Sequence, residues 1–212
     1  MFGTHDLLLF IFAGWMLNVT PGPDTALIVA RSTQMGLRGG FTACSGIALG
    51  IVAHITAAAI GLSAIIAASA TAFGIIKFVG AAYLIYIGVR MMLTRPAIEP
   101  GDTAQLPRTV LPLRAVFWQG FWSNALNPKV AIFFLAFLPQ FVNVDAPSKA
   151  LAFFFLGLVF NINGTLWNLI VAYVVARASS ALRGTKRIQR WIDGAIGAMF
   201  VALGVKLALY QR

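Results

Sequence analysis

The chain has little charge, a single cysteine and only two histidines. Charged residues make up 10% of its 212 positions, against roughly a quarter in a typical soluble protein. So few charges cannot cover the surface of a soluble domain of this size, which excludes a soluble globular protein. The lone Cys44 also excludes an intramolecular disulfide.

Motifs of the common enzyme classes are absent as well. No His, Cys and Glu residues have metal-ligand spacing, no glycine-rich loop is placed to hold a phosphate, and no serine lies in a nucleophile motif. The net charge of +10 would suit nucleic acid, but the basic residues fall between apolar runs and form no aromatic-interleaved stripe. The sequence therefore predicts no enzyme, no metal or other cofactor and no nucleic-acid partner.

What the sequence has instead is 59% apolar residues, arranged in long runs. A helix needs roughly 20 residues to cross a hydrocarbon core of about 30 Å. The runs predict an all-α membrane protein of six transmembrane helices in a lipid bilayer. The predicted spans are 7–30, 41–67, 73–93, 115–141, 150–175 and 192–209.

One long proline-rich polar stretch, 94–114, divides the spans into two sets of three. This predicts a first three-helix repeat over 1–93, a cytoplasmic linker over 94–114 and a second repeat over 115–212. With three spans each, the repeats are inverted relative to one another. Gly-Val followed by a base closes both span three (Gly88–Arg90) and span six (Gly204–Lys206). Small residues and a terminal base are, however, also common in unrelated membrane helices.

Basic residues are unevenly divided between the two sides of the membrane. Eleven of the 16 follow spans one, three and five, whereas four lie on the opposite side and Lys129 lies within a span. Because cytoplasmic loops are enriched in Lys and Arg, both termini are predicted to face outward. The eleven are Arg31, Arg38, Arg90, Arg95, Arg108, Arg114, Arg177, Arg183, Lys186, Arg187 and Arg190.

Proline interrupts the first span of each half at matching places. The two segments are Thr20-Pro21-Gly22-Pro23 and Asn127-Pro128. Proline removes a backbone donor, and a helix broken at bilayer depth needs protein or a cavity to satisfy the freed groups. Paired broken helices in two related halves indicate the central binding site of a secondary transporter. The alternative is a pair of kinks that only shape the packing.

At each break a polar residue precedes proline, so Thr20 and Asn127 are predicted to cap new half-helices. The free amides and partial positive charge of a helix start suit a carboxylate. The carbonyls freed before each break, around Leu17 to Val19 and Ser123 to Leu126, would suit an ammonium. One site would thus match both poles of a zwitterion.

Three ionisable residues lie in or beside this region. Asp24, one turn into the first re-started helix, either pairs with a substrate ammonium, carries a coupling proton, or is only stabilised by its own helix start. His54 is either a proton carrier or a buried histidine bonded to a neighbouring helix. Lys129 either contacts a substrate carboxylate or Asp24, or lies in a watery vestibule.

Small and amide residues predict how the spans pack. Gly46 and Gly50 form a face that lets another helix approach closely. Asn161, Asn163 and Asn168 in span five predict hydrogen bonds between helices, with cavity lining as the alternative.

Five segments together resemble the lysine-exporter (LysE) superfamily, and within it the homoserine/threonine-exporter (RhtB-type) branch is most similar. They are Thr20–Asp24, Gly36–Phe41, Gly80–Leu84, Asn127–Lys129 and Phe137–Phe141, and the match runs in order along essentially the whole chain. The resemblance implies a bacterial inner-membrane exporter of amino acids or close derivatives, driven by the proton gradient, with a homodimer as one expected assembly. It also implies that the Pro-Gly-Pro-Asp and Asn-Pro-Lys segments frame the pathway.

The sequence thus predicts a secondary exporter that moves a small, neutral amino acid outward against entering protons. The alternatives are an exporter of basic amino acids or of an inorganic ion, and a subunit that assembles a membrane complex. Asp24 and His54 are the predicted proton-coupling residues. The predicted substrate-binding residues are Thr20, Pro21, Gly22, Pro23, Asp24, Asn127, Pro128 and Lys129.

Overall fold

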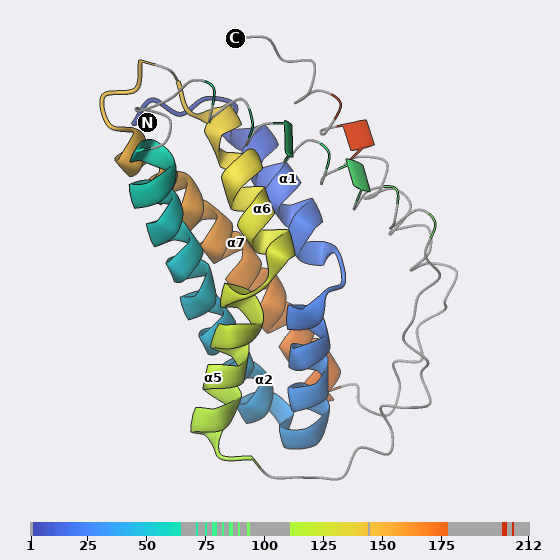
Figure 1. The fold of residues 1–212 in the computed structure, drawn as a ribbon. Coiled ribbons are helices and arrows are strands. Elements are labelled where there is room, and N and C mark those ends of the chain that lie inside the picture. Colours follow the sequence, from blue (N-terminus) through green and yellow to red (C-terminus); the bar gives the residue numbers. More distant parts are fainter. Residues whose placement is uncertain are drawn as a thin grey trace.

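The computed structural model describes residues 2–64, 111–143 and 145–177, with single positions between 71 and 93 and at 201, 202 and 205. The extended regular elements within these ranges are all helices (Figure 1). The β-structure within them is one isolated bridge between Thr4 and Val142. The predicted all-α class is confirmed for this part of the chain. Most of the linker and most of the predicted spans 73–93 and 192–209 lie outside the described residues, so the duplication into three-helix repeats stays a prediction.

The first predicted span is built from two helices with a break between them. Helix α1 (Leu7–Val19) ends at Thr20, whose backbone is extended, and α2 (Pro23–Ala57) begins after the extended Gly22. The interruption lies where the prolines predict it, because Pro21 and Pro23 have no backbone N–H to continue the α1 ladder.

Helix α2 itself consists of two helices joined at Gly36. With the π-helical turn η1 (Ala58–Leu62) it makes a 40-residue apolar run, which as a straight helix would measure about 60 Å. Gly36 has φ 64° and ψ −154°, a conformation that side chains with a Cβ rarely adopt. Figure 1 shows the chain reversing direction between the blue and cyan parts of α2. The reversal separates the first and second predicted spans.

The fourth predicted span is also broken. Helix α5 (Leu113–Ala125) meets α6 (Pro128–Ala136) at an angle of 46°, and a 3-10 turn, η3 (Leu138–Phe141), continues α6. Helix α7 (Lys149–Arg177) is long and apolar enough to cross a membrane unbroken. These bounds agree with the predicted spans 115–141 and 150–175 to within a few residues.

Glycines set the distance between α2 and α5. A Cβ on Gly50 would lie 2.8 Å from the carbonyl oxygen of Phe121, and one on Gly46 would collide with the carbonyl of Phe117. Gly120 faces α2 in the same way from the α5 side. The close-packing face predicted at Gly46 and Gly50 is therefore confirmed, and it brings the end of α5 against the middle of α2.

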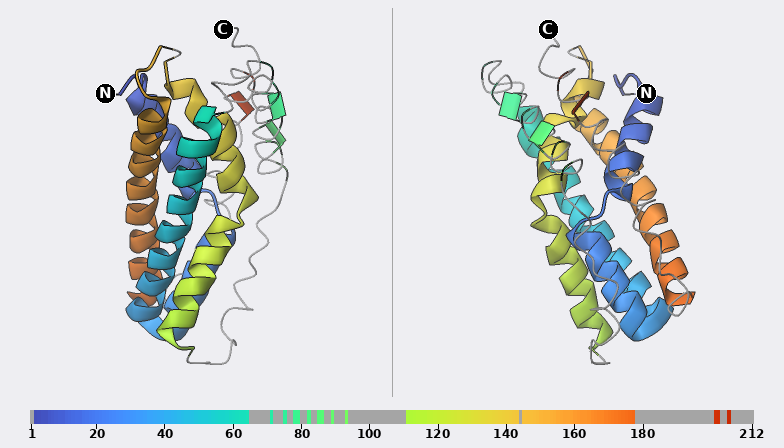
Figure 2. Two further views of the ribbon diagram at one scale, coloured as in Figure 1. Left: turned by 60° about the vertical axis from the view of Figure 1, so that its left-hand side comes forward. Right: turned by 90° about the vertical axis from the view of Figure 1, so that its right-hand side faces the viewer.

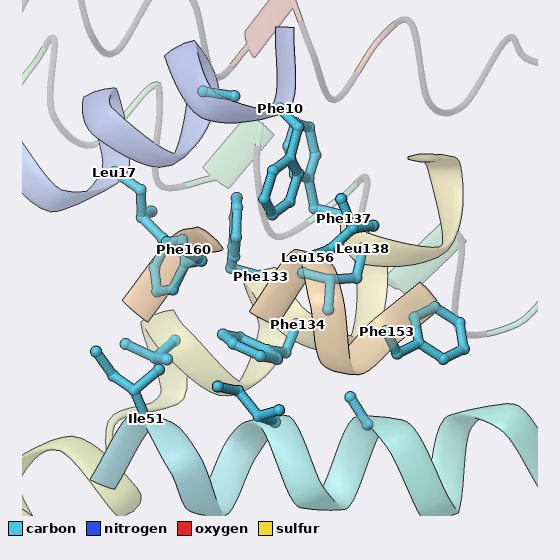
Figure 3. Packing of buried hydrophobic residues seen from close by; sticks show 14 of the residues in the cluster. Phe10, Leu17, Ile51, Phe133, Phe134, Phe137, Leu138, Phe153, Leu156 and Phe160 are labelled. Carbon is cyan, nitrogen blue, oxygen red and sulfur yellow. The ribbon is translucent and has the colours of Figure 1, made fainter. Parts of the chain in front are cut away.

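An aromatic cluster fills the space between α1, α6 and α7. Phe133 of α6 lies 4.9 Å from Phe160 of α7 and 6.3 Å from Phe10 of α1, measured between ring centroids. Figure 3 shows these rings pointing toward one another between the helices. Aromatic pairs with ring centroids about 4.5–7 Å apart stabilise a protein beyond the area they bury, by roughly 0.5–1.5 kcal/mol a pair.

The two breaks lie at the same level, about halfway along the bundle. Figure 1 and both views of Figure 2 place the link between α1 and α2 beside the bend between α5 and α6. Side chains at one break can therefore contact the backbone and side chains at the other.

Candidate functional site

The carboxylate of Asp24, in the first turn of α2, is held by the second break. It accepts hydrogen bonds from Ser123 Oγ and Asn124 Nδ2, each at 2.7 Å, and from Asn127 Nδ2 at 3.3 Å. Ser123 and Asn124 belong to the last turn of α5, and Asn127 begins α6. Three donors from one break thus converge on the acid of the other.

Lys129 makes the reciprocal connection. Its Nζ donates to the carbonyl oxygens of Leu17 at 3.1 Å and of Thr20 at 3.0 Å, at the C-terminal end of α1. These carbonyls are among the last of the helix, which have no backbone partners within it. The C-terminal end of a helix also carries a partial negative charge, which favours a cation. Of the carbonyls predicted to accept an ammonium, that of Leu17 accepts one here, and the ammonium is that of Lys129.

The predicted caps have different outcomes. Asn127 caps α6, because its Oδ1 accepts a hydrogen bond from the backbone amide of Lys129 at 3.0 Å. The prediction that Thr20 caps α2 is wrong. Its hydroxyl donates back to the carbonyl of Met16 at 2.8 Å, and the cap is Gly22, since Pro23 takes the first helical position.

Gly22 also lies beside the ammonium of Lys129. A Cβ at Gly22 would lie 3.4 Å from Lys129 Nζ, which is an ordinary van der Waals contact. Of the predicted prolines, Pro21, Pro23 and Pro128 shape the two breaks.

A small cavity of about 20 Å³ lies between the breaks, with room for about one water molecule. Asp24 and Lys129 both line it, yet they form no ion pair within 4.0 Å. The other polar residues in its wall are Asn18, Thr25, Asn124, Asn127 and Asn168. The apolar wall is formed by Leu17, Ile47, Ile51, Val130 and Phe160.

His54 lies outside the cavity wall. Its Nε2 is 3.0 Å from the carbonyl oxygen of Asn124, and since a carbonyl only accepts, the Nε2 of His54 donates. Its ring also packs 5.8 Å from that of Phe134. Of the predicted proton-coupling residues, Asp24 therefore lines the cavity, whereas His54 bonds to a neighbouring helix.

The asparagines of span five separate into different roles. Asn161 Nδ2 donates to the carbonyl of Ala48 at 3.2 Å, an interhelical bond of the predicted kind. Asn168 lines the cavity, which was the alternative. Asn163 does neither, and its Nδ2 is buried without a partner among the described residues.

Sequence reasoning missed Asn18, Ser123 and Asn124 as site side chains. A usable signal existed, since all three are polar residues within four positions of a break in an otherwise apolar span. In the part of the chain that the structure describes, no three His, Cys, Asp or Glu side chains gather as a metal site would require. The site therefore offers two opposite charges, amide groups and an apolar wall.

Known proteins of similar sequence share this chain's length. Over 210 residues it is 29% identical to the uncharacterized membrane protein YrhP of Bacillus subtilis, covering 97% of this chain and 99% of that protein. It is 25% identical over 210 residues to the leucine efflux protein of Salmonella typhimurium, covering 99% and 98%. No solved structure shows a significant match.

The family model described as "LysE type translocator" matches residues 15–211, which includes both breaks and the whole cavity wall. The chain therefore belongs to the LysE type translocator family.

Proposed function

We propose that the protein is a secondary exporter of small neutral amino acids across the bacterial inner membrane, exchanging them for protons. The observation that carries the proposal is the pair of opposite charges, Asp24 and Lys129, that line one cavity without forming an ion pair. Ionisable residues inside a membrane protein are costly to insert, and they commonly mark the path of a substrate or an ion. A zwitterion supplies a partner for each of them.

The two poles follow from the charges. The ammonium of the substrate pairs with Asp24, and its carboxylate pairs with Lys129. Two of the three N–H donors of Lys129 bond to Leu17 and Thr20, and the third is available to the substrate carboxylate. Both charged residues are anchored from the opposite break. Binding therefore ties the two halves of the chain together.

The cavity wall favours a neutral side chain. Apolar groups of Ile47, Ile51 and Phe160 face the cavity. Asp24 is the only acid among the lining residues that the structure describes, so a second cationic group on a basic amino acid would find no partner. Similarity to a leucine efflux protein supports the same substrate class.

Competition at Asp24 provides the exchange. A proton or the ammonium of the substrate neutralises this carboxylate, but both cannot do so at once. The cavity of about 20 Å³ is too small for any amino acid, so loading requires the bundle to open. Rocking of one broken helix against the other would expose the site to each side in turn.

The rival functions fit the site less well. A cation exporter would gather several oxygen ligands around its ion, whereas this wall has one carboxylate facing one lysine. An assembly subunit would be served by unbroken helices. We further propose outward-facing termini, a cytoplasmic linker at 94–114, inverted repeats over 1–93 and 115–212, a homodimer and membership of the homoserine/threonine-exporter branch.

Counterflow in proteoliposomes tests the function. Purified protein is reconstituted with unlabelled leucine inside, and uptake of radiolabelled leucine, threonine, homoserine, lysine and glutamate is compared. Neutral amino acids should accumulate and lysine should not, and an inward-directed proton gradient should drive leucine out. Uptake of lysine alone, or of no amino acid by protein that remains folded, would overturn the proposal.

A further inference from the structure

The side-chain oxygen of Asn124 is a buried acceptor with no hydrogen-bond partner among the described residues. Asn124 is 1% exposed and lines the cavity. Buried polar atoms are nearly always paired, so each exception in a native structure calls for an explanation.

The orientation of this amide is fixed by its neighbours. The nitrogen donates to Asp24 Oδ2 at 2.7 Å, and a carboxylate only accepts, so the NH₂ group must face Asp24. The oxygen is therefore the atom left free. The backbone carbonyl of Asn124 is held as well, by the N–H of His54 at 3.0 Å and by the amide of Asn127 at 2.9 Å.

The free oxygen lies beside the acid that the proposed function pairs with an ammonium. We propose that Asn124 selects a primary ammonium, which donates one N–H to Asp24 and a second to Asn124 Oδ1. The inference rests on the proposed function and deepens it, because charge alone would not distinguish a primary ammonium from a methylated one. A ligand with a single N–H satisfies only one of the two acceptors.

His54 then acts as a positioning residue. Its N–H bonds the Asn124 carbonyl in the last turn of α5, beside the amide of Asn127 that bonds the same oxygen. Losing this bond would let the last turn of α5 shift and would misplace the free oxygen. A glutamine at position 54 retains an N–H donor, whereas a leucine does not.

The probes are leucine and N,N-dimethylleucine, which keeps the positive charge but has one N–H. Calorimetry on the purified full-length protein measures both affinities. Wild type should bind leucine at least about tenfold more tightly, as expected for one hydrogen bond to a charged group. Asn124→Leu should weaken leucine binding by about tenfold or more and bring the ratio of the two affinities close to one.

Ser123→Ala is the matched control. Ser123 Oγ and Asn124 Nδ2 each donate to Asp24 at 2.7 Å, so both variants remove one donor from that carboxylate. Only Asn124→Leu also removes the free acceptor. Ser123→Ala should therefore weaken the binding of leucine and of N,N-dimethylleucine by the same factor and leave the ratio of the two affinities unchanged.

His54→Leu and His54→Gln give a second test that leaves the cavity wall intact, in case Asn124→Leu does not fold. The leucine variant should lower the affinity ratio and the glutamine variant should restore it. If wild type binds leucine but does not discriminate against the dimethylated ligand, or if Asn124→Leu keeps the wild-type ratio, this inference fails while the proposed function stands. If wild type binds no amino acid, the proposed function fails and the inference fails with it.

Discussion

Asn127 donates from its Nδ2 to the carboxylate of Asp24 at 3.3 Å while its Oδ1 caps α6 through the amide of Lys129. A single side chain thus completes one half-helix and holds the acid of the other. The cap and the link to Asp24 use different atoms of Asn127, so substitution can separate them.

Asn127→Ser keeps a capping oxygen but is too short to donate to Asp24, whereas Asn127→Ala loses both bonds. The alanine variant should lose about 1 kcal/mol of stability, the usual value of an N-cap, and the serine variant should lose much less. Both should transport poorly. Thermal unfolding in detergent and leucine exchange in proteoliposomes measure the two effects, and wild-type exchange by Asn127→Ser would show that the bond to Asp24 is dispensable.

Asp24→Asn should reduce leucine exchange by about tenfold to a hundredfold, because a hydrogen bond to a charged group is replaced by one to a neutral amide. The protein should stay folded, since the oxygen of the new side chain still accepts from Ser123 or Asn124. Asp6→Asn is the matched control. It removes an exposed acid that pairs with His5 and does not line the cavity. Equal exchange by the two variants would return Asp24 to a structural role.

The two breaks and the limits of the fourth and fifth spans were predictable from sequence because their causes are local. Proline lacks an N–H wherever it falls, and an apolar run of given length spans a bilayer in any context. The cap of α2 was mispredicted for an equally local reason. Thr20 is a good N-cap by type, but two prolines follow it within three residues, so the chain stays extended through Gly22 and the helix begins later.

The partners of Asp24 were not predictable in the same way. Ser123 and Asn124 lie 99 and 100 positions away, and only the close packing of α5 on the Gly46–Gly50 face brings them to the first break. Lys129 shows a second limit. Sequence reasoning assigned the carbonyls at the end of α1 to a ligand, but it could not show that a side chain from the other break already occupies them.

Gly36→Ala should lower the stability of the protein by about 1–3 kcal/mol, because the left-handed backbone at this reversal strains a residue with a Cβ. Gly61→Ala is the control. No described atom lies within 4 Å of an added Cβ at either position, but only Gly36 has a positive φ. The temperature of thermal unfolding should therefore fall for Gly36→Ala and stay unchanged or rise for Gly61→Ala. Equal shifts would mean that the turn tolerates an ordinary residue.

Both termini should be accessible from outside, given the eleven basic residues on the opposite side of the six predicted spans. Cys44 is the only cysteine. A Cys44→Ala variant with one new cysteine at either terminus can therefore be labelled at that terminus alone. An impermeant maleimide should label both positions in intact cells. Labelling only after the membrane is permeabilised would reverse the topology.

Lys129→Met tests whether the two charges act on one ligand. Removing the ammonium of Lys129 should weaken the binding of leucine strongly. It should hardly affect the binding of isopentylamine, because this ligand has no carboxylate. Asp24→Asn should weaken the binding of both ligands, because each carries an ammonium. Lys149→Met, at the start of α7, controls for loss of a lysine outside the cavity wall. Calorimetry with the two ligands on each variant measures these differences.

The double variant Asp24→Asn with Lys129→Met completes the cycle. Asp24 and Lys129 form no ion pair, but opposite charges on one cavity attract each other across it, and each single change removes that attraction while leaving one charge behind. The double change leaves neither charge. The loss of stability should therefore be smaller than the sum of the single losses, by about 0.5–3 kcal/mol. Its leucine affinity should be no worse than that of the weaker single variant. Strictly additive losses in both measurements would mean that the two charges act independently, and the two-pole site would be wrong.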